Sequence, residues 1–123
     1  MEIRKVSTAE EMDEVYKLTH DQYVKEGYIA PQPDGRLRHY PHLDGIPETT
    51  VLIAVDEGRV VGTNTLTLDG PAGLHVESDS AFKTIASFYR IAAAASGTKL
   101  ACSWRIVTHP EARNQLSLSL IHI

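Results

Sequence analysis

Apolar and polar positions along the chain follow first a strand period and then a helix period. Alternating charged and apolar residues over 2–6 predict a short strand. Two overlapping capping boxes over 7–11 predict that a helix begins next. Apolar and aromatic side chains then recur at helical spacing over 12–23, and Gly27 suits the C-terminal cap.

The middle of the chain predicts a β-hairpin, a second helix and a further strand. A β-branched apolar run over 49–55, a turn and an alternating segment over 60–68 form the expected hairpin. Helical spacing and an alanine tract over 80–96 predict a helix that Gly97 ends. The next strand is predicted over residues 100–108. The order β-α-loop-β-β-α-β indicates an α/β protein with a mixed central sheet and flanking helices.

Residues 29–48 are expected to form a long loop. They contain four prolines and two glycines, so neither a helix nor a strand can run through them. A loop of this length is typical of a lid or a binding loop. Its His39-x-x-His42-x-Asp44 pattern has metal-ligand residue types. A proline-rich loop gives those side chains no fixed geometry, so we favour a polar lid and expect no metal.

Composition and charge argue against several classes of function. The 123 residues are 42% hydrophobic and 23% charged, as in an ordinary globular protein. A formal net charge of −4 without a Lys/Arg run argues against nucleic-acid binding. Cys102 is the only cysteine, which excludes an internal disulfide and indicates a reducing compartment. There is neither a signal peptide nor an apolar run of roughly 18 residues, so we expect a cytoplasmic protein without a membrane span.

The element order and two stretches, AVDEGRVVGTNTLTL and CSWRIVTHPEARN, resemble the first two-thirds of an acyltransferase of the GNAT superfamily. The resemblance implies a GNAT-like acyl-CoA N-acyltransferase fold. In that fold the turn after the central strand and the next helix N-terminus hold the phosphates of an acyl carrier. The positions that this implies as contacts to the carrier are Val107, Thr108, Arg113, Asn114 and Gln115.

Four further stretches are similar to the autoinducer synthases and the N-acyl amino acid synthases: EVYKLTHDQYVKEGY, HLDGIPETTVLIAVDEGRVVG, LDGPAGL and SWRIVT. The similarity implies transfer of an acyl group from acyl carrier protein or acyl-CoA, used as co-substrate, to the amine of an amino acid or a related small molecule. No cofactor is expected to be bound permanently. Tyr23 and Tyr28 take the places of pocket aromatics, and Asp44 and Arg105 take those of a loop acid and the central-strand arginine.

Some residues differ from the pattern of these families, and the differences argue against certain classes of substrate. Two arginines and a glutamate of the lactone-forming synthases are replaced by Thr19, Thr65 and Cys102. Their loss argues against homoserine-lactone formation and favours an N-acyl amino acid synthase or a relative of it. Residues 113–117 contain no glycine, which argues against an acetyl-CoA loop and favours a carrier-protein donor.

Candidate catalytic groups can also be weighed by their chemistry. Arg105 lies in an apolar strand, where a charge is costly unless it is paired, and Asp44 is a suitable bidentate partner. The pair is either structural or positions the acceptor. Cys102 is interpreted as a small buried residue rather than a nucleophile. Glu77 and His75 are candidate proton acceptors for the amine.

The expected mechanism is direct attack of the amine on a thioester, aligned by backbone groups at the end of the central strand. An ordinary acetyl-CoA N-acetyltransferase is the alternative. We expect 1–117 to be the N-terminal two-thirds of a single acyltransferase domain. The tail 118–123, LSLIHI, can be encoded by a string that looks like a sequencing-library adapter, so we expect it to be foreign to the gene. A third interpretation is therefore an inactive truncated fragment.

Overall fold

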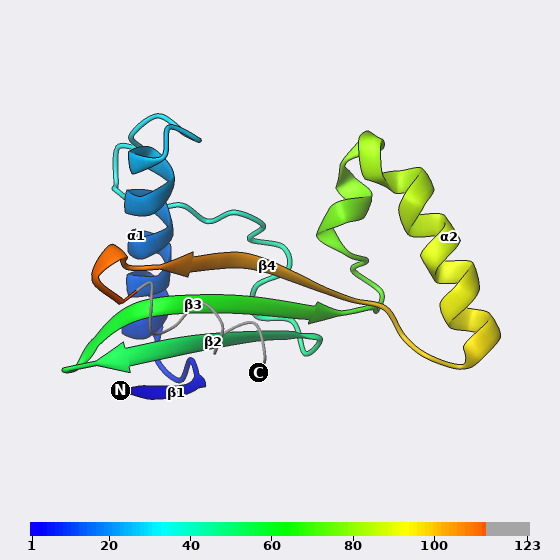
Figure 1. Ribbon diagram of the computed structural model, residues 1–123, viewed down its shortest axis with the longest axis horizontal. Helices are drawn as coiled ribbons and strands as arrows, with labels where there is room; N and C mark the ends of the chain where they lie inside the picture. The colour runs from blue at the N-terminus through cyan, green and yellow to red at the C-terminus, as the bar shows by residue number, and fades with distance from the viewer. Residues whose placement is uncertain (113–123) are drawn as a thin grey trace. The chain divides into compact units, whose positions relative to one another are not determined.

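A computed structural model describes residues 1–112, without the side chain of Ser78. Its strands and α-helices are β1 (Glu2–Lys5), α1 (Ala9–Lys25), β2 (Thr49–Asp56), β3 (Arg59–Leu68), α2 (Ser80–Ser96) and β4 (Ala101–Thr108) (Figure 1). Two short 3-10 helices, η1 (His75–Ser78) and η2 (Pro110–Ala112), follow β3 and β4. The element order expected from the sequence is confirmed, with boundaries close to those predicted.

The four strands form one sheet in the order β1-β2-β3-β4. β1 pairs with β2 antiparallel, with Glu2 opposite Val55 and Lys5 opposite Leu52. Neighbouring arrows along the rest of the sheet also run in opposite directions (Figure 1). Within residues 1–112 the sheet is therefore antiparallel throughout, which differs from the mixed sheet that was expected.

Two compact units make up the described chain. Unit 1 contains residues 1–39, 51–65 and 104–112, and unit 2 contains residues 40–50 and 66–103. Unit 1 holds α1 and most of the sheet, whereas unit 2 holds η1, α2 and the strand ends beside them.

The core of unit 1 lies on both faces of its strands. Neighbouring strand residues such as Ile53 and Ala54 point to opposite faces. On the Ile53 side, α1 contributes Val15 and Leu18, which pack with further side chains from three strands: Val51, Val60 and Val107. A smaller cluster of Ala54, Val61 and Ala112 forms on the other side. The apolar stripe of α1 therefore packs on the sheet as its spacing predicts.

The start of α1 is stabilised by one cap and one ion pair. Thr8 is the N-cap, and its Oγ1 accepts a hydrogen bond from the backbone N–H of Glu11 at 3.1 Å. The Glu11 carboxylate accepts hydrogen bonds from Arg4 at 3.0 Å and from the backbone N–H of Ser7 at 2.9 Å. These bonds, the one from Arg4 first, lower the pKa of Glu11 to about 2.

We expect Glu11→Gln to make the folded state less sensitive to acid. The folded-state pKa of Glu11 lies below its ordinary value of 4.5, so its ion pair stabilises the fold fully above pH 4.5. That stabilisation is lost progressively as the pH falls from 4.5 towards 2. Urea unfolding at a series of pH values should show a flatter acid limb for Glu11→Gln. The control is Glu10→Gln, which removes an equal charge from an exposed position in the same turn and should keep the limb steep.

Unit 2 is organised around α2 and the guanidinium of Arg90. Asp79 caps the helix by accepting from the backbone N–H of Ala81 at 2.9 Å, and Gly97 ends it with a positive φ of 69°. Arg90 donates to Glu77 of η1 at 2.8 Å and to Asp69, which follows β3, at 2.9 Å. One arginine of α2 thus connects two other segments of the unit.

Candidate functional site

Arg105 stands out in unit 1 because a buried charge and an unusual backbone coincide there. The residue exposes only 2% of its surface and lies within β4. Its φ is +51°, in the left-handed region that side chains larger than glycine rarely adopt. Such backbone conformations cost about 1–3 kcal/mol and are found most often at functional sites. Arg105, which the sequence analysis proposed as a site residue, therefore combines a buried charge with an unusual backbone conformation.

Aromatic rings surround the guanidinium of Arg105. Its Cζ lies 4.4 Å from the ring centroid of Trp104 and 5.7 Å from that of Tyr16. Both distances fall within cation–π range, which is about 6 Å. The Cζ of Arg38 approaches the same Tyr16 ring at 5.3 Å. Unit 1 thus holds a permanent positive charge against aromatic faces.

His39 and Tyr23 extend this group of rings. The His39 ring makes edge contacts with Tyr23 and with Trp104, at centroid distances of 5.8 and 6.2 Å. We call Tyr16, Tyr23, His39, Trp104 and Arg105 the aromatic cluster. Residues from α1, from the following loop and from β4 meet in it.

The two tyrosines predicted to shape a pocket have different environments. Tyr23 is half-buried and packs against the core of unit 1. Tyr28 is 70% exposed and contacts Tyr23 edge-on at 5.6 Å. Tyr23 therefore belongs to the aromatic cluster and also packs on the core, whereas Tyr28 lies at the surface. A pocket role for either stays a prediction.

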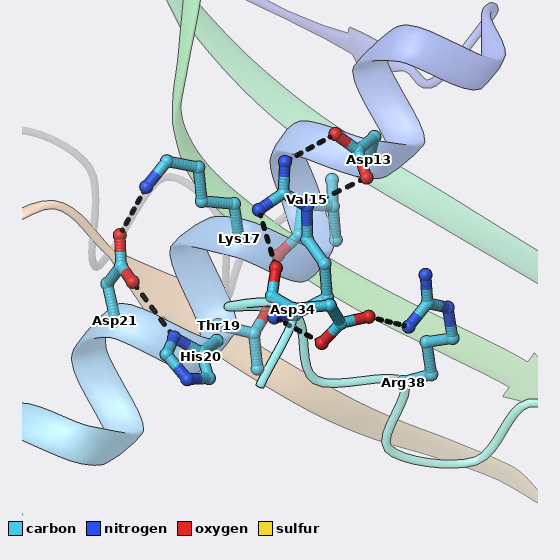
Figure 2. Close-up of polar contacts among 9 residues, drawn as sticks. Asp13, Val15, Lys17, Thr19, His20, Asp21, Asp34 and Arg38 are labelled. Carbon is cyan, nitrogen blue, oxygen red and sulfur yellow. Dashed lines mark hydrogen bonds and ion pairs between the residues drawn. The ribbon is translucent and has the colours of Figure 1, made fainter. Parts of the chain in front are cut away.

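The loop that carries His39 is fastened to α1 by polar contacts (Figure 2). Arg36 donates to both carboxylate oxygens of Asp13 at 2.8 and 2.9 Å, and Arg38 pairs with Asp34 at 2.9 Å. His20 Nε2 accepts from the backbone N–H of Gln32 at 3.0 Å. The contacts of Arg36 and Gln32 hold the part of the loop before His39 against the helix, and the pair of Arg38 and Asp34 lies within the loop. Closure of the loop as a lid stays a prediction.

The sequence pattern placed His39 in a polar lid, with a metal site as the less favoured alternative, and gave no indication of its place in the aromatic cluster. Burial, and then the positive charge of Arg105, hold the pKa of His39 below its ordinary value of 6.5. The imidazole is therefore neutral at pH 7. No signal within the loop predicts this, because Trp104 and Arg105 come from a distant part of the chain.

Asp44 lies in unit 2, where it is half-buried, while Arg105 belongs to unit 1. The ion pair expected between them stays a prediction, as does the positioning role of Asp44. Two threonines replace arginines of the lactone-forming synthases, and both are buried. Thr19 Oγ1 donates to the backbone oxygen of Val15 at 2.7 Å within α1, and Thr65 is fully buried in β3.

An apolar cavity lies within unit 2. Its volume is about 240 Å³, and residues from η1, α2 and the start of β4 line it: Leu74, Val76, Ala86, Tyr89, Leu100 and Cys102. Burial, and then the charge of Glu77, raise the pKa of the Cys102 thiol. A thiol that stays protonated at neutral pH is a poor nucleophile, which supports the structural interpretation of this cysteine.

The predicted proton acceptors of unit 2 are engaged elsewhere. Glu77 pairs with Arg90 and accepts from the backbone N–H of Leu74 at 3.0 Å. Its bond from Arg90 lowers the pKa of the Glu77 carboxylate, which makes it a weak base. The His75 ring contacts Tyr40 in a tilted arrangement, with a centroid distance of 5.1 Å and an interplanar angle of 40°.

The residues expected to contact the acyl carrier are only partly described. The Val107 side chain belongs to the core of unit 1, and Thr108 is half-buried at the end of β4. Arg113, Asn114 and Gln115 lie outside the described residues, as does the segment 118–123. The domain boundary at 117 is likewise untested.

Two classes of feature are absent from residues 1–112. No group of three or more His, Cys, Asp or Glu side chains is placed there to hold a metal ion. Neither described helix combines the length and apolar character needed to cross a membrane.

The chain matches the model of one protein family and is similar in fold to a solved structure. Residues 14–123 match the sequence model of the family described as N-acyl amino acid synthase FeeM. The chain is also similar to the solved structure of FeeM, an N-acyl amino acid synthase from uncultured soil microbes, with 19% identity and a TM-score of 0.73. The match covers 98% of this chain and 60% of that one. No curated protein matches the sequence.

Proposed function

The chain belongs to the N-acyl amino acid synthase FeeM family, and from this premise we propose that the intact protein joins an acyl group to the amine of an amino acid. The observation that carries the proposal is the family match over residues 14–123. The GNAT-like fold and the buried arginine of β4 are consistent with it.

The proposed reaction is direct acyl transfer. The amine nitrogen attacks the thioester carbonyl carbon, a C–N bond forms, the C–S bond breaks and the carrier leaves as a thiol. The protonated thiol of Cys102 argues against a covalent enzyme intermediate at that residue. Backbone groups at the end of β4, around Val107 and Thr108, align the thioester in this proposal.

We assign recognition of the acceptor's carboxylate to Arg105. A guanidinium carries its charge at every physiological pH and can donate two parallel hydrogen bonds to a carboxylate. Stacking on Trp104 limits the rotamers of Arg105 and so orients the group before the acceptor binds. Burial strengthens the interaction, because the surroundings have a low dielectric constant.

Within unit 2 taken by itself, we propose that the apolar cavity binds an alkyl chain. Its lining is almost entirely hydrocarbon, so an alkyl chain that enters it is removed from water. The sequence over 113–117 contains no glycine, and glycine is the residue that lets a backbone approach a pyrophosphate closely, so we propose an acyl carrier protein as donor.

The test is an assay of the intact protein with three donors: long-chain acyl carrier protein, long-chain acyl-CoA and acetyl-CoA. Each donor is supplied with a mixture of amino acids, and amide products are detected by mass spectrometry. Long-chain N-acyl amino acids formed fastest from the carrier protein are the expected result. Products from acetyl-CoA alone would replace this proposal by an ordinary N-acetyltransferase. The absence of any amide would contradict both.

A further inference from the structure

We propose that the apolar cavity of unit 2 receives the methyl end of the acyl chain, and that its size makes about eight carbon atoms the shortest segment that binds with full affinity. This inference rests on the proposed function, because it names the chain length of the acyl group that is transferred. It gives Leu74 and Ala86 a role in the specificity of that reaction.

The cavity has one exposed end and one buried end. Tyr89 is 62% exposed and Ala101 is exposed as well, so these two residues form the mouth. Leu74 and Ala86 expose only 5% and 8% of their surface, so they form the base. An alkyl chain therefore enters past Tyr89 with its methyl end first and stops against the base.

The lining of the cavity suits hydrocarbon rather than a polar group. None of the described residues that line it carries a charge, since burial, and then the charge of Glu77, raise the pKa of the Cys102 thiol and keep it protonated. Apolar cavities do not hold ordered water, but they do bind apolar ligands. Each CH₂ group that moves from water into such a space raises the affinity about fourfold.

The volume of the cavity sets the number of carbon atoms. The cavity measures about 240 Å³, and a CH₂ group takes up a volume similar to that of a water molecule in the liquid, about 30 Å³. About eight carbon atoms therefore fill the space. A shorter chain leaves part of it empty and loses affinity with each missing carbon. The additional carbons of a longer chain stay outside the mouth and add little.

An ion-pair network holds the base in place. The backbone N–H of Leu74 donates to the Glu77 carboxylate at 3.0 Å. Arg90 of α2 donates to Glu77 at 2.8 Å and to Asp69 at 2.9 Å. Arg90 lies one helical turn after Ala86, so both residues of the base are connected to the same guanidinium. A base that is fixed in this way should give an abrupt limit to the chain length.

The experiment measures how straight-chain primary alcohols, from butanol to dodecanol, bind to the 123-residue chain. Cys102 is the only cysteine of this chain and lines the cavity, so protection of its thiol from N-ethylmaleimide reports occupancy of the cavity. We expect the dissociation constant to fall about fourfold with each added carbon as far as octanol and to stay constant beyond it. Absence of protection, or an affinity that continues to rise through dodecanol, would overturn the proposal.

Leu74→Ala tests whether the base sets the limit. The substitution removes three carbon atoms, so the affinity should level off about three carbons later, near undecanol. Ile91→Ala removes as many carbons from an exposed position of α2 outside the cavity, and it should keep the limit at octanol. Leu74→Ala also destabilises the core, so Ala86→Val, which adds two carbons to the base, is a second variant with an expected limit near hexanol. A limit that stays at octanol in both folded variants would contradict the role of the base.

Synthesis of the amide is measured separately, with the intact protein and acyl carrier proteins of increasing chain length. The kcat/KM value should level off with chain length, and Leu74→Ala should move that point by about three carbons, as it does for the alcohols. A protein that makes no amide but shows the octanol limit would overturn the proposed function alone. A protein that makes amides without such a limit would overturn only the assignment of chain length.

Discussion

Replacing Arg105 by lysine is expected to raise the KM for the amino-acid acceptor about 10–100-fold. A hydrogen bond to a charged group is worth about 1.5–3 kcal/mol, and each 1.4 kcal/mol is tenfold in affinity. Lysine keeps the charge but loses the planar fork that binds a carboxylate through two bonds and stacks on Trp104. The measurement is steady-state kinetics of the intact protein with acceptor varied and donor saturating.

The matched control is Arg59→Lys, because the Arg59 side chain is 60% exposed at the start of β3. That variant should keep the KM of the unaltered protein. Circular dichroism should show that Arg105→Lys is folded, since its main chain and charge are retained. An unchanged acceptor KM in folded Arg105→Lys would remove Arg105 from acceptor binding and leave it as a structural charge.

Replacing Ala86 by phenylalanine is expected to lower kcat/KM for long-chain donors about 200-fold. Ala86 is buried on α2 and lines the apolar cavity, so the larger ring occupies space assigned to the acyl chain. Each CH₂ group kept out of water is worth about 0.8 kcal/mol, and a chain shortened by about four such groups loses the stated factor. An acetyl donor has no long alkyl chain to remove from water and should be affected little. Competition between donors of different length measures the change.

Ala95→Phe provides the control, because Ala95 is exposed on the same helix and does not line this cavity. Thermal unfolding of both variants separates overpacking from loss of binding. If Ala86→Phe folds and retains its preference for long chains, the acyl chain does not bind in the cavity of unit 2.

The helices and strands were predictable because the signals for them are local. Thr8 and Asp79 accept backbone hydrogen bonds at the two helix starts, and Gly97 adopts the positive φ that ends α2. Each of these interactions spans only a few residues, so the sequence pattern contains it completely. The proline-rich loop over 29–48 was predictable for the same reason.

The candidate site was predictable only in part. Similarity to the acyltransferase families pointed to Arg105 and Tyr23, because single positions of a motif can be matched one by one. The left-handed φ of Arg105 and its stacking on Trp104 were not predictable, since nothing in SWRIVT requires them. His39 was placed in a polar lid, and a metal site was weighed for it because His42 and Asp44 follow it in the sequence.

The sequence by itself determined the order of elements, the face of α1 that packs on the sheet and the family to which the chain belongs. Periodicity, caps and motifs are enough for these, because each depends on residues near one another in the chain. Only the tertiary structure decided that His39, Tyr16 and Arg105 share one aromatic cluster. Folding of α1, the loop and β4 against a common core creates that proximity, and with it the neutral imidazole beside a buried positive charge.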